Sequence, residues 1–414
     1  MVNQSAPGVV IVGAGQAGAE VATALRQKGY SGSITMIGEE RYPPYRRPPL
    51  SKAFLAGEAT LESLHLKPEA VYQRHGIRCR LGVRVMAIDT IARRLRLSDG
   101  STLRYNNLVL ATGGRPRPLP VPGADSDCVH YVRTVDDVLR LREHFCAGAR
   151  LVLIGGGYIG LETAAVAIKA DLKVTVVEAM DRVLARVAAP ALSEFYESVH
   201  REHGVEILTG AAVKCLETEE SGTWVRLTDG RERQADLVIV GVGLIPETRL
   251  AEEAGITVLP EGVVVDSGCR TSVPDVYAVG DCTYHENDFY GRHMRVESVP
   301  NATEQARALA ATLCDEPIRY AAVPWFWSDQ YGLKLQMVGL SEGYDELVIR
   351  GERASRSFIA FYLREGVLIS ADAVNRPQDF MIARRLVAAR AQPAPDDLAR
   401  EDRPLKALVE SKVV

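Results

Sequence analysis

The sequence has little that would suit a secreted, disulfide-stabilised or membrane-spanning protein. Its seven cysteines are odd in number and scattered, and no C-x-x-C pair or neighbouring histidine forms a zinc pattern. We therefore expect reduced structural thiols and no metal site. Residues 1–7 lack the basic and apolar regions of a secretory signal, and no apolar run approaches the roughly 18 residues that span a bilayer. These absences favour a cytoplasmic protein without a membrane segment.

A strong excess of charge of one sign is also missing. The formal net charge is −4, and 47% of the residues are hydrophobic and 25% are charged. Such a balance gives no global attraction to nucleic acid or to anionic membranes, so we expect neither as a partner. With 414 residues, the chain is long enough to form two or three domains of ordinary size.

What the sequence does contain is an internal repeat, and its first copy lies near the N-terminus. An apolar run at 9–12 predicts a strand, which leads into the glycine-rich segment 13–18, GAGQAG. A helix is predicted from there to Lys28. A second strand at 34–37 comes next, and it leads to Glu39.

The second copy has the same layout in the middle of the chain. The apolar run 151–154 predicts a strand and is followed by the segment 155–160, GGGYIG. A helix is predicted to about Ala170, and a second strand at 174–177 ends at Glu178. Each copy therefore reads as strand, glycine turn, helix, strand and acid, which is the βαβ fingerprint of dinucleotide binding.

The residue types of this fingerprint have separate physical roles. The first glycine makes a tight turn, the second lets the backbone approach a pyrophosphate, the third lets helix and strand pack closely, and the acid binds ribose hydroxyls. Two ordinary glycine turns are the alternative, but the complete context occurs twice. The candidate cofactor-binding residues are Gly13, Ala14, Gly15, Gly18 and Glu39 in the first copy and Gly155, Gly157, Tyr158, Ile159, Gly160 and Glu178 in the second.

Two dinucleotide sites in one chain suggest two dinucleotides that exchange electrons. One nicotinamide and one flavin is the economical pairing, because a second nicotinamide would have no obvious chemistry. At the second copy, the Glu178 carboxylate favours NADH over NADPH, since it attracts ribose hydroxyls and repels a 2′-phosphate. Arg182 and Arg186 come later in the sequence and are the residues that could oppose this preference.

Two further motifs resemble the superfamily of two-dinucleotide-binding flavoproteins that includes glutathione reductase. They are Ala111-Thr112-Gly113 and the T-x5-Y-A-x-G-D pattern of residues 271–281. The resemblance implies that the first fingerprint holds FAD and the internal one holds NAD(P)H. It also implies that Asp281 contacts the ribitol or phosphate region of the flavin, although a turn aspartate at the end of a strand is the alternative.

Longer segments resemble the NADH-dependent ferredoxin reductases of the putidaredoxin reductase type. The resemblance implies that electrons pass from NADH through FAD, one at a time, to a 2Fe–2S ferredoxin that supplies a cytochrome P-450 type monooxygenase. Related members of that family serve ring-hydroxylating dioxygenases or rubredoxin. The segments are 48–52, 108–118, 155–162, 297–301, 324–331 and 374–377.

A missing thiol supports the same subgroup. Disulfide reductases of the superfamily carry a C-x4-C pair after the first βαβ unit, whereas this chain has no cysteine before Cys79 and reads YRRPPLSK at 45–52. Without a redox thiol, electrons have to leave the flavin directly for an outside acceptor.

The resemblance also implies roles for single residues. Lys52 and Glu162 pair beside the isoalloxazine ring, Trp327 lies against the flavin or at the electron exit, Tyr158 covers the flavin where nicotinamide enters, and Arg133 contacts the flavin. The alternatives are an unpaired surface lysine and glutamate, a core aromatic and a surface arginine. Lys52, Glu162 and Trp327 are therefore the candidate catalytic residues. Further cofactor-binding candidates are Leu50, Val85, Val299, Arg186 and Gly243.

We expect an α/β fold with two Rossmann-like domains, similar to glutathione reductase, and a smaller α+β C-terminal domain. The FAD-binding domain takes 1–110 and 247–322, the NAD-binding domain takes 111–246, and the C-terminal domain takes 323–414. Antiparallel strands are predicted in the last domain, then a helix that begins at Asp379 as its N-cap. The tail after Gln392 contains proline and charge and is expected to be partly loose. The strands span 335–338, 346–349, 358–363 and 367–369, and the helix spans 379–390.

The sequence therefore predicts a FAD-dependent NADH:ferredoxin reductase that is a monomer or a weak homodimer. A reductase of a small-molecule acceptor such as a quinone, ascorbyl radical or oxygen, a reductase of rubredoxin or a dioxygenase ferredoxin, and a redox-responsive signalling flavoprotein are the alternatives. Docking of an acidic ferredoxin would depend on local basic residues, which could equally be solvated helical side chains. The candidates are Arg307 and, near the C-terminus, Arg384, Arg385, Arg390 and Lys406.

Overall fold

The computed structural model describes residues 8–220 and 222–410, which form two compact units. Each unit is assembled from three separate stretches of chain. The predicted domain boundaries divide the chain according to the cofactor that each part binds, so these units do not test them and they stay a prediction. The first unit combines the described residues of Met1–Arg46, Leu61–Arg115 and Ile245–Pro324, and the second combines those of Arg47–Thr60, Pro116–Leu244 and Trp325–Val414.

A parallel sheet forms the centre of the first unit. Its strand order is β20-β7-β1-β2-β3, so β1 (Val9–Val12) lies between β2 (Ile34–Gly38) and β7 (Asn107–Leu110). Every residue of β1 and β2 is buried, as expected for strands covered on both faces. The outer strands are β3 (Ile77–Leu81) and β20 (Val276–Ala278).

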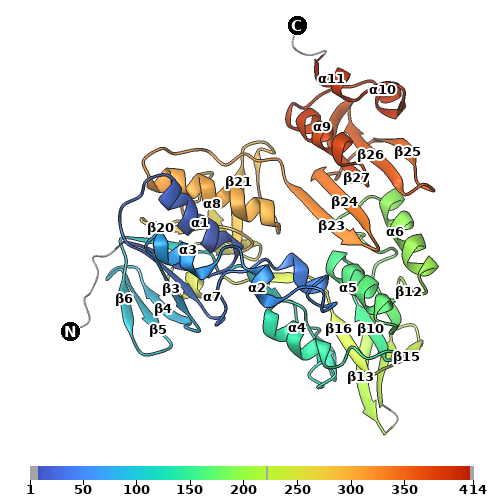
Figure 1. Ribbon diagram of the computed structural model, residues 1–414, viewed down its shortest axis with the longest axis horizontal. Helices are drawn as coiled ribbons and strands as arrows, with labels where there is room; N and C mark the ends of the chain where they lie inside the picture. The colour runs from blue at the N-terminus through green and yellow to red at the C-terminus, as the bar shows by residue number, and fades with distance from the viewer. Residues whose placement is uncertain (1–7, 221, 411–414) are drawn as a thin grey trace. The chain divides into compact units, whose positions relative to one another are not determined.

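Two helices of the first unit, α1 (Gln16–Gln27) and α8 (Val299–Leu313), lie side by side (Figure 1). Small residues such as Ala22 and Ala306 let them pack closely with the sheet. Smaller elements complete the unit: α2 (Leu61–Leu64), α3 (Glu69–Arg74), β4 (Val85–Asp89), β5 (Arg94–Leu97), β6 (Thr102–Arg104), α7 (Arg249–Glu253), β18 (Val258–Leu259), β19 (Gly262–Val265), β21 (Thr283–Asn287) and β22 (Arg292–Met294).

The second unit contains another parallel sheet, ordered β12-β11-β10-β16-β9. Strand β10 (Arg150–Ile154) pairs with β11 (Lys173–Val177) and β16 (Leu237–Val240), which repeats the arrangement around β1. The predicted second fingerprint therefore has the expected strand-helix-strand layout. The other elements are η1 (Pro48–Ser51), β9 (Val129–His130), α4 (Val135–Arg142), α5 (Tyr158–Lys169), α6 (Pro190–Glu202), β12 (Glu206–Leu208), β13 (Val213–Glu219), β14 (Gly222–Leu227) and β15 (Glu232–Ala235), with β8 (Gly114–Pro116) and β17 (Leu244–Pro246) at the unit boundaries.

An antiparallel sheet comes last in the second unit, ordered β23-β24-β27-β26-β25. The predicted antiparallel strands are confirmed, although each extends beyond its predicted bounds. Helix α9 (Pro377–Ala388) packs on β24 and β27. The strands are β23 (Trp325–Gln330), β24 (Leu333–Gly339), β25 (Glu346–Glu352), β26 (Ser357–Arg364) and β27 (Val367–Val374).

The expected N-cap of the C-terminal helix was wrong. The helix begins at Pro377, with Arg376 rather than Asp379 at the N-cap. Proline suits the first helical position because its fixed φ is helical and its missing N–H needs no partner there. Asp379 lies in the first turn, where its carboxylate faces the positive end of the helix dipole and contacts Arg376 at 3.5 Å.

The expectation of a loose tail was also wrong for its described part. Leu398, Leu405 and Leu408 are buried, in and beside the short helices α10 (Pro395–Ala399) and α11 (Lys406–Glu410). The buried Arg350 donates hydrogen bonds to the backbone carbonyls of Leu398, Arg400 and Arg403, so one guanidinium satisfies several carbonyls of this segment. Residues 411–414 lie outside the described part of the chain.

One carboxyl group is enclosed in the antiparallel sheet. Asp372 on β27 is buried, and the Tyr362 hydroxyl donates to its Oδ2 at 2.7 Å. Burial raises the pKa of Asp372 to about 7, and the hydrogen bond from Tyr362 opposes only part of that change. The folded chain thus keeps a proton that an unfolded aspartate, with a pKa of about 3.9, has already lost.

We expect stability to fall as the pH rises from about 4 through 7, because the folded state binds the extra proton in that window. The loss reaches at most about 4 kcal/mol. Asp372→Asn, which cannot ionise, should show a smaller decline of Tm between pH 5 and 8 in calorimetry. Asp329→Asn, at an exposed position on β23, serves as the control and should behave like the wild type. Equal pH slopes for Asp372→Asn and the wild type would contradict the assignment.

Candidate active site

The first glycine turn has the shape of a phosphate cradle. Gly13 has φ +116°, and a Cβ there would lie 2.1 Å from the Ala111 carbonyl oxygen. A Cβ on Gly18 would lie 2.0 Å from the Gly13 oxygen, so both positions exclude any side chain. Gly15 differs, because a Cβ on it would meet nothing within 4 Å, and it is the N-cap of α1. Open space beside a helix N-terminus is what a pyrophosphate requires, so these residues fit a dinucleotide.

The other first-unit candidates lie at the carboxyl ends of the same parallel strands, where open α/β sheets bind their ligands. Glu39 comes directly after β2 and is 65% exposed, with Arg84 at 3.7 Å. Asp281 lies beyond β20, one residue after Gly280 at φ +81°. Val299 is the first residue of α8, at a helix N-terminus. Ala14 packs against Gly38, and Ala111, Thr112 and Gly113 come directly after β7.

Val85 differs from these candidates. It begins β4 and lies in a hydrophobic cluster with Leu95 and Leu97. Only its backbone could reach a ligand, because its side chain belongs to the core. Its cofactor role stays a prediction.

The second glycine turn repeats the cradle within the second unit. A Cβ on Gly155, at φ +108°, would lie 2.5 Å from the Gly241 oxygen, and one on Gly160 would lie 2.3 Å from the Gly155 oxygen. Gly157 again has open space and is the N-cap of α5. Ile159, in the first turn of that helix, is 51% exposed although apolar. The fit to a second dinucleotide rests on the same geometry.

Glu178 comes directly after β11 and is tied to the second glycine turn. Its Oε2 accepts from the Gly156 N–H at 2.7 Å, and its Oε1 accepts from the Met180 N–H at 2.9 Å. Arg182 is occupied, because it donates to the carbonyls of Ala185 and Ala188 and to Ser193 Oγ.

Arg186 and Gly243, two further candidates, are neighbours. The Arg186 guanidinium lies 3.6 Å from where a Cβ on Gly243 would stand. Gly243 has φ +111° and lies beyond β16, at the carboxyl end of the second parallel sheet. Arg186 is exposed, so it is the nearby arginine that could meet a bound nucleotide.

The expected charge pair is present in the second unit. Lys52 Nζ lies 2.7 Å from Glu162 Oε2, and the carboxylate is buried while Lys52 is 20% exposed. Ser51 Oγ donates to Glu162 Oε2 and Ser328 Oγ donates to its Oε1, each at 2.6 Å. These short, charge-assisted bonds compensate the carboxylate for lost water. The alternative of an unpaired surface lysine and helix glutamate is thereby excluded.

Aromatic side chains surround the start of α5. The Tyr158 ring lies 5.0 Å from that of Phe326, and its Oη lies 2.8 Å from Met337 Sδ. Enclosure by protein raises the pKa of Tyr158 well above its ordinary value, so the hydroxyl stays protonated. Trp327 is half-buried beside Trp325, with ring centroids 5.6 Å apart.

Leu50 and Arg133, the remaining second-unit candidates, lie in and beside the short segment that also carries Lys52. Leu50 is buried in η1. The backbone carbonyl of Arg133 accepts from Arg47 at 2.5 Å, which ties the residue before η1 to the stretch before α4.

Sequence reasoning missed the polar partners of Glu162. Ser51 and Ser328 lie within segments that carried the family resemblance, but they were given no role. Ser328 and Gln330 alternate with exposed or half-buried residues along β23 and are themselves buried. Polar residues at buried alternate positions of a strand are the signal that could have found them.

Comparison with known proteins defines the class. Residues 7–306 match the family described as pyridine nucleotide-disulphide oxidoreductase, and residues 325–409 match the family described as reductase C-terminal. The chain therefore belongs to the pyridine nucleotide-disulphide oxidoreductase family.

The similarity to individual ferredoxin reductases extends over nearly the whole chain. Putidaredoxin reductase of Pseudomonas putida is 47% identical over 407 residues, which cover 97% of this chain and 96% of the relative. The reductase in a covalent putidaredoxin reductase–putidaredoxin complex superposes with a TM-score of 0.94 at 46% identity, covering 98% and 99% of the two chains. The ferredoxin reductase for the CYP199A2 system from Rhodopseudomonas palustris gives a TM-score of 0.94 at 42% identity, covering 97% and 99%.

We expect NADH to be preferred over NADPH, because the Glu178 carboxylate repels a 2′-phosphate and Arg182 is already hydrogen-bonded. Glu178→Gln keeps an oxygen that can accept the Gly156 N–H but removes the charge. In Glu178→Gln, kcat/KM for NADPH divided by kcat/KM for NADH should be about tenfold higher than in the wild type. Glu178→Ala, which also removes the support of the glycine turn, should in addition weaken both nucleotides. Equal kcat/KM for NADH and NADPH in the wild type would contradict the prediction.

Proposed function

We propose that this chain is a FAD-dependent NADH:ferredoxin reductase whose acceptor is a 2Fe–2S ferredoxin. The observation that carries the proposal is the pair of glycine cradles, one at the carboxyl ends of a parallel sheet in each unit. When bound, FAD supplies the exchange between the two-electron donor NADH and a one-electron acceptor. The match to ferredoxin reductases over almost the whole chain supports this choice of reaction.

The two glycine cradles indicate which residues would hold the two cofactors. The turn of Gly13, Gly15 and Gly18, with Glu39 and Asp281, would hold FAD. The corresponding turn of the second unit, with Glu178, would hold NADH. The Lys52 ammonium provides a positive charge at a partly exposed position, and its ion pair with Glu162 holds the side chain in place. A preorganised charge stabilises negative charge that develops beside it, without reorganisation during the reaction.

The state of the thiols agrees with direct electron delivery to an outside acceptor. All seven cysteines are free. Burial raises the pKa of Cys79 to about 11 and that of Cys269 to about 12, so these thiols stay protonated and unreactive. Free thiols are typical of a reducing compartment, and we propose a cytoplasmic location on this ground. Within residues 8–220 and 222–410, no helix combines the length and the apolarity that crossing a bilayer demands.

A finer proposal concerns the destination of the electrons. We propose that the ferredoxin supplies a cytochrome P-450 type monooxygenase, with the reductase acting as a monomer or a weak homodimer. The similarity to the reductase for the CYP199A2 system supports the first part. Turnover with 2Fe–2S ferredoxins compared with turnover with a soluble quinone separates this function from reduction of a small molecule.

We expect Glu162→Gln to slow flavin reduction more than it weakens NADH binding, because the carboxylate positions Lys52 rather than contacting the nucleotide. The limiting rate in stopped-flow measurements at saturating NADH should fall about tenfold, with the Kd for NADH within about threefold of the wild type. Glu194→Gln changes an exposed carboxylate on α6 that lies near Arg353 and should have no effect. An unchanged limiting rate in Glu162→Gln would remove the pair from the reaction.

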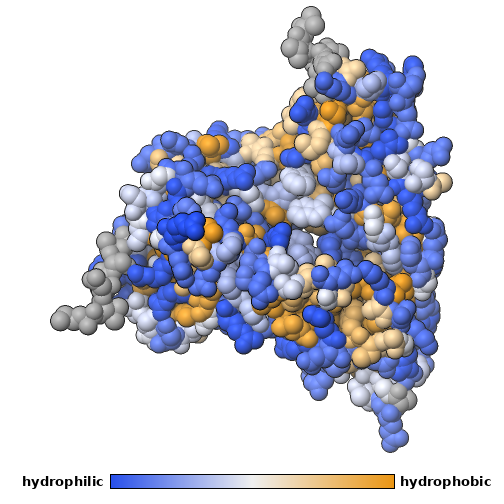
Figure 2. Space-filling view, in the orientation of Figure 1, coloured by the Kyte–Doolittle hydropathy of each residue, from blue (hydrophilic) through white to orange (hydrophobic). Residues whose placement is uncertain are grey.

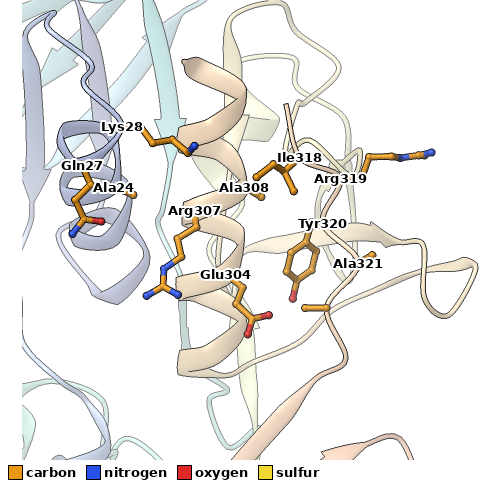
Figure 3. A pocket seen from close by; sticks show the side chains of 11 residues that line it. Ala24, Gln27, Lys28, Glu304, Arg307, Ala308, Ile318, Arg319, Tyr320 and Ala321 are labelled. Carbon is orange, nitrogen blue, oxygen red and sulfur yellow. The ribbon is translucent and has the colours of Figure 1, made fainter. Parts of the chain in front are cut away.

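Docking of an acidic ferredoxin requires local positive charge, because the net charge of the chain is −4. Hydrophilic residues predominate on the face drawn in Figure 2, and apolar residues appear there in small groups. A groove in the first unit offers basic residues. Lys28, the C-cap of α1, lines it with Arg307 of α8, Arg319 and Ile318, which is 56% exposed (Figure 3).

Two of the three basic residues of this groove are already paired. Lys28 contacts Glu316 at 2.8 Å, and Arg319 contacts Asp288 at 3.0 Å. Among the residues that the structure describes, Arg307 has no carboxylate within ion-pair distance. It is therefore the better placed of the three to meet a partner's carboxylate. The C-terminal candidates are in the other unit, where Arg384 lies over the Trp325 ring at 4.8 Å.

We expect Arg307→Glu to reduce the association rate with ferredoxin about tenfold at low salt, because steering depends on long-range charge. The effect should shrink as salt rises, and flavin reduction by NADH should be unchanged. Arg249→Glu reverses another exposed first-unit arginine, on α7, and tests whether charge alone is responsible. A wild-type association rate for Arg307→Glu at low salt would exclude Arg307 from docking.

A further inference from the structure

A continuous line of hydrogen bonds within the second unit ends at the Glu162 carboxylate. Ser328 Oγ donates to Glu162 Oε1 at 2.6 Å, and Gln330 Nε2 donates to Ser328 Oγ at 3.1 Å. Gln330 Oε1 lies 2.8 Å from His200 Nε2, and His200 Nδ1 lies 3.2 Å from Tyr331 Oη. Ser328, Gln330 and His200 are at most 1% exposed. We refer to Ser328, Gln330, His200 and Tyr331 as the donor line.

The carboxylate fixes the direction of every bond in the donor line. An ionised Glu162 only accepts, so the Ser328 hydroxyl has to donate to it and its oxygen is left to accept. The amide nitrogen of Gln330 therefore faces Ser328, and its oxygen faces His200. His200 has to carry its proton on Nε2, and its Nδ1 accepts from the Tyr331 hydroxyl. All four donors point toward Glu162.

The environment of His200 agrees with this neutral tautomer. Burial lowers the pKa of His200 to about 4, the nearby His203 acts in the same direction, and only the bond to Gln330 opposes it. The ring contacts Tyr331 edge-on, with centroids 4.9 Å apart. Tyr331 in turn stacks on His203 at 3.8 Å. His200 is thus an uncharged link near neutral pH.

The residue types of the donor line suit it to orienting the Glu162 carboxylate and not to conducting protons. A hydroxyl or an imidazole can take a proton at one side and release another, whereas the Gln330 amide would have to change tautomer to do so. The line therefore does not serve as a path for protons. A row of aligned dipoles does hold an anion in place, and its bonds strengthen one another in a low-dielectric interior.

Local structure explains why these residues meet. Ser328 and Gln330 are two apart on β23, so they share one face of the strand with Phe326, which contacts Tyr158 of α5. Glu162 lies one turn after Tyr158 on the same helix, and His200 lies on α6. One face of β23 thus presents an aromatic ring and two polar groups to these helices.

We propose that Ser328, Gln330 and His200 are positioning residues that hold the Glu162 carboxylate against Lys52. The proposal rests on the function proposed above for the Lys52–Glu162 pair. The three residues act only through Glu162, so their influence on the reaction should decline with their distance from it along the donor line.

The first test uses the flavin-loaded protein and compares near-isosteric variants. Ser328→Ala should lower the limiting rate of flavin reduction by NADH about tenfold, because it removes a bond to a charged group. Gln330→Met, which keeps the length of the side chain, should lower it about threefold. Neither should change the Kd for NADH by more than about twofold. Ser370→Ala removes a buried hydroxyl of the same sheet that donates to the Val338 carbonyl, and it should leave the rate unchanged.

A double-variant cycle distinguishes positioning from general loosening of the fold. In a Glu162→Gln background, Ser328→Ala and Gln330→Met should slow reduction by no more than about twofold further, since the group they orient has lost its charge. Full additivity would overturn the proposal. If Glu162→Gln itself leaves the rate unchanged, the proposed role of the pair fails. If Glu162→Gln slows the reaction and Ser328→Ala does not, only the positioning proposal fails.

A second readout does not depend on turnover. Nitrogen-15 NMR of the His200 ring in the wild-type flavoprotein should show the neutral tautomer with its proton on Nε2 from pH 6 to 8. In Gln330→Met the ring loses its Nε2 acceptor and should no longer be confined to that tautomer. A proton on Nδ1 in the wild type, or a charged ring at pH 7, would contradict the donor line.

Discussion

The contact between Lys52 and Glu162 is the interaction on which the packing of η1, α5 and β23 depends. A carboxylate that is 4% exposed has lost most of its water, and a single counter-ion rarely compensates for that loss. Two serine hydroxyls supply the missing hydrogen bonds, and they come from segments far apart in the sequence, η1 and β23. The charge pair therefore also ties these two segments to α5. A change at any partner alters both the local packing and the surroundings of the buried carboxylate.

A second constraint comes from the backbone rather than from charge. In both units the first glycine of the turn and the third face a carbonyl oxygen at a distance that no Cβ tolerates, while the middle glycine has open space. The glycines of each turn therefore account both for the close packing of strand and helix and for the room that a phosphate needs. Because the two turns repeat this geometry at the ends of β1 and β10, the two cofactor cradles differ mainly in their acidic residue, which is the exposed Glu39 in one and the tethered Glu178 in the other.

The parts of the structure that obey a local pattern could be predicted from the sequence. The two βαβ units and the Lys52–Glu162 contact belong to this group, the contact through family resemblance. Sequence reasoning did not find the donor line, because its members come from α6, β23 and the turn after it and meet only in the tertiary fold. The N-cap at Arg376 was missed because Asp379 also suits a helix start. The helix instead begins two residues earlier, at Pro377, because proline favours the first helical position. The docked tail was missed because three buried leucines are spread through a charged segment.

The division into compact units has a consequence for how the chain is made. The backbone passes from one unit to the other five times, at 46/47, 60/61, 115/116, 244/245 and 324/325. During synthesis the first unit stays incomplete until residue 324 has left the ribosome, although its central strand lies at residues 9–12. Strand β7 has to wait for β20 at 276–278, and helix α1 has to wait for α8 at 299–313. No single cut or truncation of the chain can release either unit intact, because each unit is assembled from three separate stretches.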